Sequence, residues 1–452
     1  MDGVDAPGGS CPKPGDTLTH LWRLTTYKNK AGDVSSVLAW DDLTNMRLEA
    51  GKVVEARNKD IEYVGQMRVY DKIPRTQAMR NGWRIIKTRL IFINKGDDDR
   101  FVGKEFNNDI MEGLFAGTPP LEAFRYLIHE AATVRVAEEP MGSKVLMIND
   151  VSRAFSEAPA TRDICVELPP EDVTDAERRH EMVGRLRSIL YGTRDAATHW
   201  QEEVAKEMIK ARFKRGKYIP CLYFQEGRNL RTFLHGDDIA TVGTKEEVKW
   251  LKDVLEKRLE INTNCVSPAA ARLGGSRSSA ASGPSRKTTN GAAMQEGSES
   301  RLLNWVVRCT LEGWEVEPDQ RHADLILQDL MLSRANGLRS PGANYLAADR
   351  LDLMYAVKVL CLGMARPTKL HWHKLKRLGR CLVEHGRITM RYNLQGHEPD
   401  ITGHSESDWA GCRVTGKSTS GGALMIGGQF IKGWARTQTM SHSARLRQSC
   451  WH

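Results

Sequence analysis

Apolar and polar residues recur along the chain with the spacing of both helices and strands. Residues 41–60 and 119–137 carry apolar side chains at helical intervals, the second with Leu121, Phe124 and Ile128 on one face. Both segments are therefore predicted to be amphipathic helices. A third helix is expected around Trp200, which begins the series Trp200, Val204, Met208 and Ala211.

Short β-rich segments separate these helices. Residues 83–94 and 100–106 flank a polar turn and predict a basic hairpin. Val145–Ile148 predicts a buried strand that stops at Asn149-Asp150. Residues 221–242 predict three strands joined by the turns EGRN and GDD. A capping box of Thr244 and Glu247 predicts the start of another helix.

The remaining segments predict a less regular organisation. Residues 1–39 are expected to be a flexible leader, and residues 261–300, which are rich in Ser, Ala and Gly with Arg and Lys, a disordered basic linker. Helices are expected over 347–364 and 371–383. From residue 400 onward the pattern indicates strands and Gly-rich turns.

Composition is that of a globular protein with several domains: 452 residues, 40% hydrophobic and 27% charged. No signal peptide or apolar run long enough for a membrane span is visible, so an intracellular protein, cytoplasmic or nuclear, is expected. The nine cysteines form no CxxC pair, which excludes a zinc ribbon and favours reduced thiols. The net charge of +9 is compatible with a polyanion partner, and equally with a basic protein that has none.

Three aspartates form the strongest candidate site. Asp150 ends the strand VLMIND, and Asp237 with Asp238 occupies the turn of TFLHGDDIATV. Nucleotidyl transfer uses two divalent ions held by carboxylates on a rigid frame, and Mg²⁺ prefers such oxygen ligands. The alternative is that Gly-Asp-Asp is only a hairpin turn.

The flanking residues favour the first interpretation. MINDVSRAFSEAP, RLRSILYGTRDAATHWQ and FLHGDDIATVG resemble, in order and spacing, the catalytic blocks of copia-type retrotransposon reverse transcriptases, and the resemblance is continuous over about 40–260. It implies a right-hand polymerase with two Mg²⁺ ions, Mn²⁺ being the alternative, held by Asp150, Asp237 and Asp238. It also implies dNTPs, an RNA template and a DNA primer as partners.

The same resemblance assigns nucleotide-binding residues. Phe155 falls where the family places an aromatic ring against the sugar, which selects deoxynucleotides; a plain core aromatic is the alternative. Arg100 and Lys104 lie in the predicted hairpin, where cations would neutralise the triphosphate, the alternative being a solvated basic strand. Lys87 and Arg89 are weaker candidates.

Two departures from the family pattern affect this part of the chain. The predicted hairpin is shorter than usual. Arg194-Asp195 stands where Lys-Gln is common, so Asp195 would add negative charge beside a triphosphate.

The C-terminal part resembles a truncated ribonuclease H. HSESDWAGCRVTGKSTSGGALMIGGQFIKGWARTQ is similar to the first strands of that domain. Glu406 stands at the first catalytic position in place of aspartate, Asp408 matches a structural aspartate, and no carboxylate follows it. We therefore expect no ribonuclease H activity. His371 and His373 are i, i+2 on a helix and point apart, so surface histidines are expected rather than a metal pair.

The prediction is thus an α+β protein. It has a leader (1–39), β-rich fingers and a ferredoxin-like palm (40–260), the linker (261–300), a partial helical thumb and connection (301–399), and a truncated ribonuclease H-like α/β domain (400–452). The function expected is RNA-directed DNA polymerase. The alternative is a degenerate, inactive remnant that at most binds nucleic acid. No membrane partner is expected, and the sequence leaves the oligomeric state open.

Overall fold

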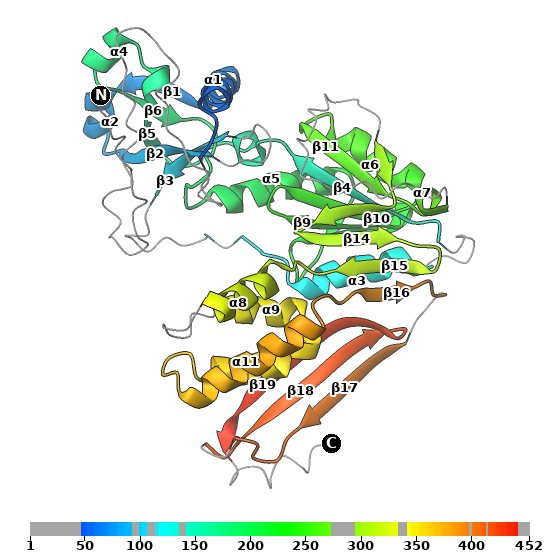
Figure 1. The fold of residues 1–452 in the computed structure, drawn as a ribbon. Coiled ribbons are helices and arrows are strands. Elements are labelled where there is room, and N and C mark those ends of the chain that lie inside the picture. The colour runs from blue at the N-terminus through cyan, green and yellow to red at the C-terminus, as the bar shows by residue number, and fades with distance from the viewer. Residues whose placement is uncertain are drawn as a thin grey trace, which may run out of the picture. The chain divides into compact units, whose positions relative to one another are not determined.

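The computed structural model describes residues 47–92, 99–105, 114, 116–134, 142–272, 294–332, 341–396, 400–412 and 415–441 (Figure 1). They divide into two compact units. The first holds the described residues up to 105 and those of Pro159–Ala196; the second holds those of 114–158 and from Ala197 onward. Each unit combines helices and sheets, so the α+β class is confirmed. The predicted leader lies outside the described residues.

The first unit is built on a sheet with the strand order β1-β6-β5-β2-β3. Its strands are β1 (Tyr70–Pro74), β2 (Arg84–Phe92), β3 (Asp99–Lys104), β5 (Ile164–Glu167) and β6 (Met182–Leu186), and its helices are α1 (Ala50–Gln66), α2 (Arg75–Arg80) and α4 (Asp175–Arg179). Val64 of α1, Ile86 of β2 and Val166 of β5 share one buried apolar cluster. The apolar face of α1 therefore packs on the sheet.

The predicted basic hairpin is confirmed, because β2 and β3 pair antiparallel. The turn between them lies outside the described residues. The first predicted helix was placed too early: it covers Ala50–Gln66 rather than 41–60. Its buried face runs from Val53 to Val64, and Glu49 before it has an extended backbone, so Leu48 is not part of the helical stripe.

The second unit contains a sheet with the order β12-β11-β4-β10-β9-β8-β7. Its strands are β4 (Val145–Val151), β7 (Lys214–Arg215), β8 (Leu222–Gln225), β9 (Leu230–His235), β10 (Asp238–Gly243), β11 (Ile261–Val266) and β12 (Gln295–Gly297). The helices beside it are α3 (Leu121–Ala132), α5 (Ala196–Lys210), α6 (Lys245–Leu255) and α7 (Pro268–Arg272). The predicted strands around Asp150 and over 221–242 are thus confirmed.

Two predictions for this region are wrong in detail. Residues 261–272 are not linker, because Ile261–Val266 form β11 against β4 and bury Ile261, Cys265 and Val266. The absence of acidic residues in this stretch predicts a linker, but its apolar residues pack against β4 and decide the structure. The capping box at Thr244 does not form either: Thr244 precedes α6 without a side-chain cap hydrogen bond, and Glu247 pairs with Arg228 instead.

A second sheet and a helical cluster follow. The sheet has the order β13-β14-β15-β16, with β13 (Glu299–Leu302), β14 (Trp305–Cys309), β15 (Gly313–Glu317) and β16 (Met390–Asn393). Its Trp305 and Trp314 share a core with Phe124 of α3. The cluster contains α8 (Arg321–Leu332), α9 (Pro341–Asp349), α10 (Met354–Cys361) and α11 (Lys369–Glu384).

The helix predicted over 347–364 is interrupted. Between α9 and α10 the chain forms a short 3₁₀ turn at Leu351–Leu353. The Arg350 side chain is buried, and its guanidinium donates to Asp352 and to the carbonyl of His385 at 2.7 Å. These bonds hold the chain in the turn and tie it to the end of α11.

The C-terminal region is an antiparallel sheet of β17 (Ile401–Ser407), β18 (Lys417–Ile426) and β19 (Gln429–Ser441). β18 and β19 meet at Gly427 and Gly428, whose φ angles of 56° and 80° favour glycine. Every residue of β17 is exposed. The strands and Gly-rich turns predicted from residue 400 are therefore present.

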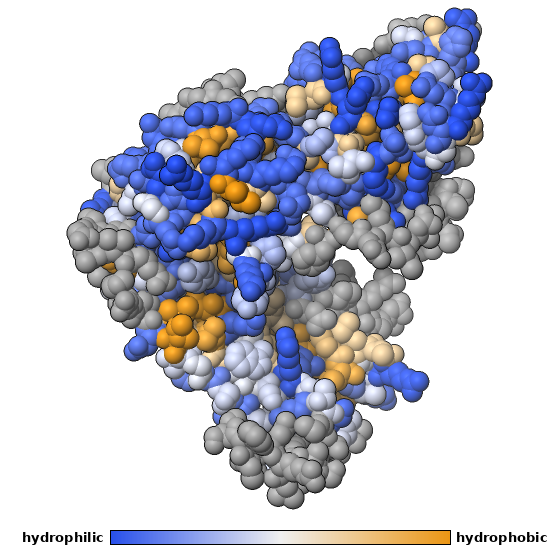
Figure 2. All heavy atoms as spheres, turned by 180° about the vertical axis from the view of Figure 1, so that it is seen from behind, coloured by the Kyte–Doolittle hydropathy of each residue, from blue (hydrophilic) through white to orange (hydrophobic). Residues whose placement is uncertain are grey.

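The surface is mostly polar on the face shown in Figure 2, where hydrophobic side chains gather in small separate patches. Within the described ranges, no helix is both long and apolar enough to cross a membrane.

Candidate active site at the β9–β10 hairpin

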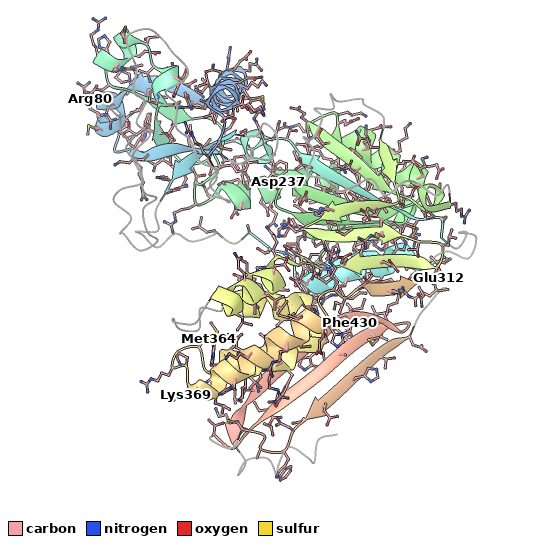
Figure 3. The ribbon with its side chains drawn as sticks, viewed as in Figure 1. Arg80, Asp237, Glu312, Met364, Lys369 and Phe430 are labelled. Atoms are coloured by element: carbon pink, nitrogen blue, oxygen red, sulfur yellow. The ribbon has the colours of Figure 1, made fainter. Side chains whose placement is uncertain are left out.

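The three aspartates lie on neighbouring strands of the second unit. Asp238 begins β10 directly opposite Asp150 of β4 in antiparallel register. Such partners project to the same face of a sheet, with Cβ atoms about 4.5–5.5 Å apart. Asp237 precedes Asp238 in the turn after β9, and Figure 3 labels it at the end of the sheet. The fold therefore gathers the three residues that the sequence singles out.

The turn that carries them is held from two sides. Gly236 adopts a positive φ of 60°, a conformation that suits glycine. The indole of Trp200 in α5, itself buried, donates from Nε1 to the Gly236 carbonyl at 2.7 Å. The backbone N–H of Val151 donates to the Asp237 carbonyl at 3.0 Å. These bonds fix the main chain of the turn relative to β4.

The three aspartates concentrate acidic side chains at the tip of the hairpin. Asp150 is exposed, while Asp237 and Asp238 are half-buried. Like charges directly opposite one another destabilise a sheet unless something neutralises them. His235 does not supply that charge, because burial lowers its pKa and the nearby Asp237 carboxylate offsets this only in part.

The chemistry of the donors fits a hard divalent cation, since carboxylate oxygens are what Mg²⁺ prefers. Their placement is incomplete: across the described ranges, no group of three or more His, Cys, Asp or Glu side chains is arranged to hold a metal ion. The strand register thus brings the residues together, and their carboxylates would have to rotate toward a common point to bind one.

Two residues beside the aspartates extend the site. Asn149 is fully buried, and its Oδ1 accepts a hydrogen bond from Thr263 Oγ1 of β11 at 2.7 Å. Sequence reasoning missed Thr263 because its segment was assigned to the linker. Phe155 lies in a 3₁₀ turn at Ala154–Glu157 and is half-buried, so the core interpretation describes it only in part. Its predicted contact with a sugar stays a prediction.

The predicted triphosphate cations belong to the first unit. Lys104 is half-buried at the end of β3, and its register partner on β2 is Lys87. Arg100 is placed in β3 opposite Ile91, and the structure describes its backbone only. The register therefore places two basic side chains opposite one another on the same face of the hairpin.

The negative charge of Asp195 is neutralised within the first unit. Arg162 donates to both carboxylate oxygens of Asp195, at 2.7 and 2.6 Å, and to both of Glu105 at 2.9 Å. Burial acts to raise the pKa of Glu105, yet Arg162 and the Arg194 N–H hold it below its ordinary value. Asp195 therefore departs from the family pattern without adding an uncompensated negative charge.

Among its described residues, the C-terminal sheet offers no comparable cluster. Glu406 is exposed in β17 and, with Asp408, lines a cavity of about 400 Å³ beside Trp434. Asp408 accepts hydrogen bonds from the N–H groups of Thr419 at 2.7 Å and Gly411 at 3.3 Å. Burial opposes ionisation of Asp408, but these bonds prevail and lower its pKa. Asp408 thus stabilises the end of the sheet.

Of the two histidines, His371 has an identifiable structural partner. Its Nδ1 lies 2.7 Å from Thr368 Oγ1 and 3.2 Å from the Thr368 N–H, which closes a capping box at the start of α11. His373 is exposed on the same helix. This arrangement assigns His371 to helix capping.

Comparison with known proteins shows which proteins the chain is similar to. No family model matches it. It is 23% identical over 427 residues to the retrovirus-related Pol polyprotein from transposon TNT 1-94 of Nicotiana tabacum, covering 86% of this chain and 29% of that protein. It is 26% identical over 297 residues to the Pol polyprotein from transposon RE2 of Arabidopsis thaliana, covering 62% and 19%.

The chain is homologous to retrotransposon Pol polyproteins. An uncharacterized mitochondrial protein of Arabidopsis thaliana is also 34% identical over 104 residues, which is 22% of this chain and 42% of that protein. The Pol homologue spans less than a third of the length of the two polyproteins it matches. The match to TNT 1-94 extends over most of the chain, so it takes in residues of both units.

Proposed function

We propose that this Pol homologue is an RNA-directed DNA polymerase of the copia type, which adds deoxynucleotides from dNTPs to a primer on an RNA template. The observation that carries the proposal is the register of Asp150 and Asp238 across β4 and β10. The neighbouring Asp237 is held by the hydrogen bond from the Val151 N–H to its carbonyl. In this reading the seven-stranded sheet belongs to the palm, and the sheet of the first unit to the fingers.

The three aspartates would hold two Mg²⁺ ions, with Mn²⁺ as the alternative. When bound, such ions lower the pKa of the attacking 3′-hydroxyl and neutralise the leaving pyrophosphate. The protein contributes the frame: Trp200 and Val151 fix the turn, and the buried strand β4 fixes Asp150. A main chain held in advance in this way would leave only the carboxylate side chains to rotate toward an ion.

Other residues would bind the nucleotide. Phe155 follows β4 by a few residues, and a half-exposed ring there suits packing against a deoxyribose and excluding a 2′-hydroxyl. Lys104 and Arg100 would neutralise the triphosphate, with Lys87 opposite Lys104 adding charge on the same face. Arg162 keeps Asp195 from opposing them.

An inactive Pol remnant that binds nucleic acid is the second candidate. It is favoured by the incomplete convergence of the three carboxylates in the described structure. The glutamate at position 406, where the ribonuclease H pattern has its first catalytic aspartate, favours the same loss for ribonuclease H. We therefore propose that ribonuclease H activity is absent under either candidate.

The deciding experiment is primer extension on poly(rA)/oligo(dT) with dTTP and Mg²⁺. We expect Asp237→Asn/Asp238→Asn to lose more than about 100-fold in rate, because metal stabilisation contributes several kcal/mol and about 1.4 kcal/mol is tenfold. Asp253→Asn, on the exposed face of α6, is the control for removing a carboxylate. Extension by wild type and control alone supports the polymerase. No extension by wild type that still binds the template–primer supports the remnant.

A further inference from the structure

Helix α11 presents a stripe of cations to solvent. Five exposed basic side chains share this face: Lys369, His373, Lys376, Arg377 and Arg380. Their spacing places them within about 100° of one another around a helix of 3.6 residues per turn, over a rise of about 16 Å. Lys369, labelled in Figure 3, marks the start of the helix.

The opposite face of α11 is already occupied. Leu375, Leu378 and Leu382 are buried in the cluster that α11 forms with α8 and α10. At Gly379 the approach to α8 is so close that a Cβ atom would collide with Leu330. The leucines of this side are therefore committed to the fold. Leu370 and Val383 near the two ends of α11 are exposed, and the basic side is the larger surface available to a partner.

The cations of this stripe are not neutralised by neighbouring carboxylates. Among the described residues, Lys369, Lys376, Arg377 and Arg380 have no carboxylate oxygen within 4.0 Å. Exposed lysines on other helices differ: Lys52 pairs with Glu49 at 3.0 Å, and Lys210 with Glu207 at 2.8 Å.

The first turn of α11 also lacks the acidic residues that commonly stabilise the start of a helix. A cation such as Lys369 does not stabilise the helix there. Helix α6, by contrast, begins with Glu246 and Glu247. A helix that accumulates cations without a carboxylate partner among the described residues, at some loss of its own stability, is suited to an external polyanion.

We propose that this face of α11, defined by Lys369, His373, Lys376, Arg377 and Arg380, binds the sugar–phosphate backbone of a nucleic-acid duplex. Phosphates recur closely enough along a duplex for each cation on a 16 Å stripe to find one. An anionic membrane would also attract the charge, but a membrane-binding helix inserts its apolar face, and here that face is buried. The inference concerns binding alone and does not depend on the polymerase chemistry at Asp237.

The test measures binding of the full chain to a fluorescent RNA–DNA hybrid by anisotropy across a salt series, without divalent metal or dNTP. The variant is Lys369→Ala/Lys376→Ala/Arg377→Ala/Arg380→Ala. Each lost phosphate contact reduces the slope of log K against log salt by about 0.9. Four lost contacts mean that, between 50 and 200 mM salt, wild-type affinity falls about 100-fold more than that of the variant.

The matched control is Lys52→Ala/Lys59→Ala/Lys206→Ala/Lys210→Ala, which removes the same charge from three exposed positions and one half-buried position that are paired with glutamates. It should bind with the wild-type slope. A charge-preserving variant, Lys369→Arg/Lys376→Arg/Arg377→Lys/Arg380→Lys, should also bind normally, and circular dichroism checks that α11 folds in each.

Three results would overturn the proposal. Equal losses in the α11 variant and the control would show attraction by net charge alone. An unchanged slope in a folded α11 variant would show that the stripe is only a solvated face. Binding to phosphatidylserine vesicles that depends on α11 while hybrid binding does not would assign the face to membranes. A failed extension assay with α11-dependent hybrid binding would reject the polymerase and keep this inference.

Discussion

The seven-stranded sheet and the C-terminal sheet both carry acidic residues at strand ends, but they support them very differently. In the first, β4 is buried from Val145 to Asn149, and its neighbours on both sides are strands. In the second, every residue of β17 is exposed, including Glu406. A carboxylate can be held only as firmly as the strand beneath it.

The difference shows how firmly each sheet holds its acidic residues. Asp150, Asp237 and Asp238 are fixed through a buried strand, an indole and a main-chain hydrogen bond. Glu406 has its backbone paired with Gly421 of β18. The Asp408 carboxylate accepts a hydrogen bond from the main-chain N–H of Thr419. Acidic residues at a strand end are therefore a weak indication of a site unless the strand is braced.

The largest expected effect on stability comes from removing Trp200, which holds the turn at Gly236. Trp200→Ala should lower the free energy of unfolding of the second unit by about 3–5 kcal/mol, since it empties a fully buried indole site and leaves the Gly236 carbonyl without its donor. Trp434→Ala, in the half-buried C-terminal sheet, should cost about 1–2 kcal/mol. Urea unfolding followed by fluorescence measures both, and equal losses would remove the contrast between the sheets.

The next largest effect on stability concerns Asp349, whose surroundings include Arg125 of α3. Arg125 packs over Trp305 at 5.5 Å and Phe430 at 5.4 Å, and its Nη2 donates to the Ala348 carbonyl. Beside it, burial raises the pKa of Asp349 to about 6, with Asp319 adding to the rise and Arg125 opposing it. Ionised Asp349 is thus disfavoured in the folded protein.

The sign follows from proton binding. Between the ordinary pKa of 3.8 and about 6 the folded state holds more protons, so the stability contributed by protonated Asp349 is lost as pH rises through that window. Asp349→Asn should flatten this dependence and raise the unfolding free energy at pH 7.5 by up to about 3 kcal/mol. Urea titrations at pH 5 and 7.5 measure it, with Asp253→Asn as control; a variant that keeps the wild-type pH slope would contradict the assignment.

Close packing gives a smaller effect. A Cβ atom on Gly243 of β10 would meet the buried side chain of Leu230, whereas one on Gly422 of β18 would meet the half-buried indole of Trp434. Gly243→Ala should therefore cost about 1–3 kcal/mol by overpacking. Gly422→Ala should cost less, because Trp434 can move toward the open cavity. Thermal unfolding of the two variants compares them, and a greater loss at Gly422 would mean that the C-terminal sheet is the more rigid.

The loss of a helix cap is expected to have the smallest effect on the free energy of unfolding. Thr244 makes no side-chain cap hydrogen bond to α6, whereas Thr174 forms a complete capping box with Glu177 at α4. Thr244→Ala should change the unfolding free energy by less than about 0.5 kcal/mol, and Thr174→Ala by about 1 kcal/mol. The same denaturant assay distinguishes them. A large loss at Thr244 would show that its hydroxyl serves β10 and the site rather than the helix.

The sequence predicted best where a single face is buried. The hairpin strands around Asp237 and the helices at Leu121 and Lys369 alternate or repeat cleanly, so their elements were placed nearly correctly. The order of motifs also placed Asp150 beside the Gly-Asp-Asp turn, and the register agrees.

The sequence predicted the structure less well where tertiary contacts determine the local conformation. Ile261–Val266 become a strand because β4 offers an edge, which local composition does not reveal. The break at Arg350 depends on carbonyls at residues 385 and 386, and the pairing of Arg162 with Glu105 and Asp195 joins segments far apart in sequence. The role of Trp200 as a donor was invisible because the same residue satisfies a helical apolar pattern.

The hydrogen bonds at the hairpin tip also have a consequence for ion selectivity. The main-chain oxygens of Gly236 and Asp237 are already engaged by Trp200 and Val151. An ion at this tip would therefore be coordinated by carboxylates and by the water it keeps. Calcium, which seeks six to eight oxygens and commonly recruits carbonyls, would be poorly served, whereas a small ion that retains most of its hydration shell would lose little.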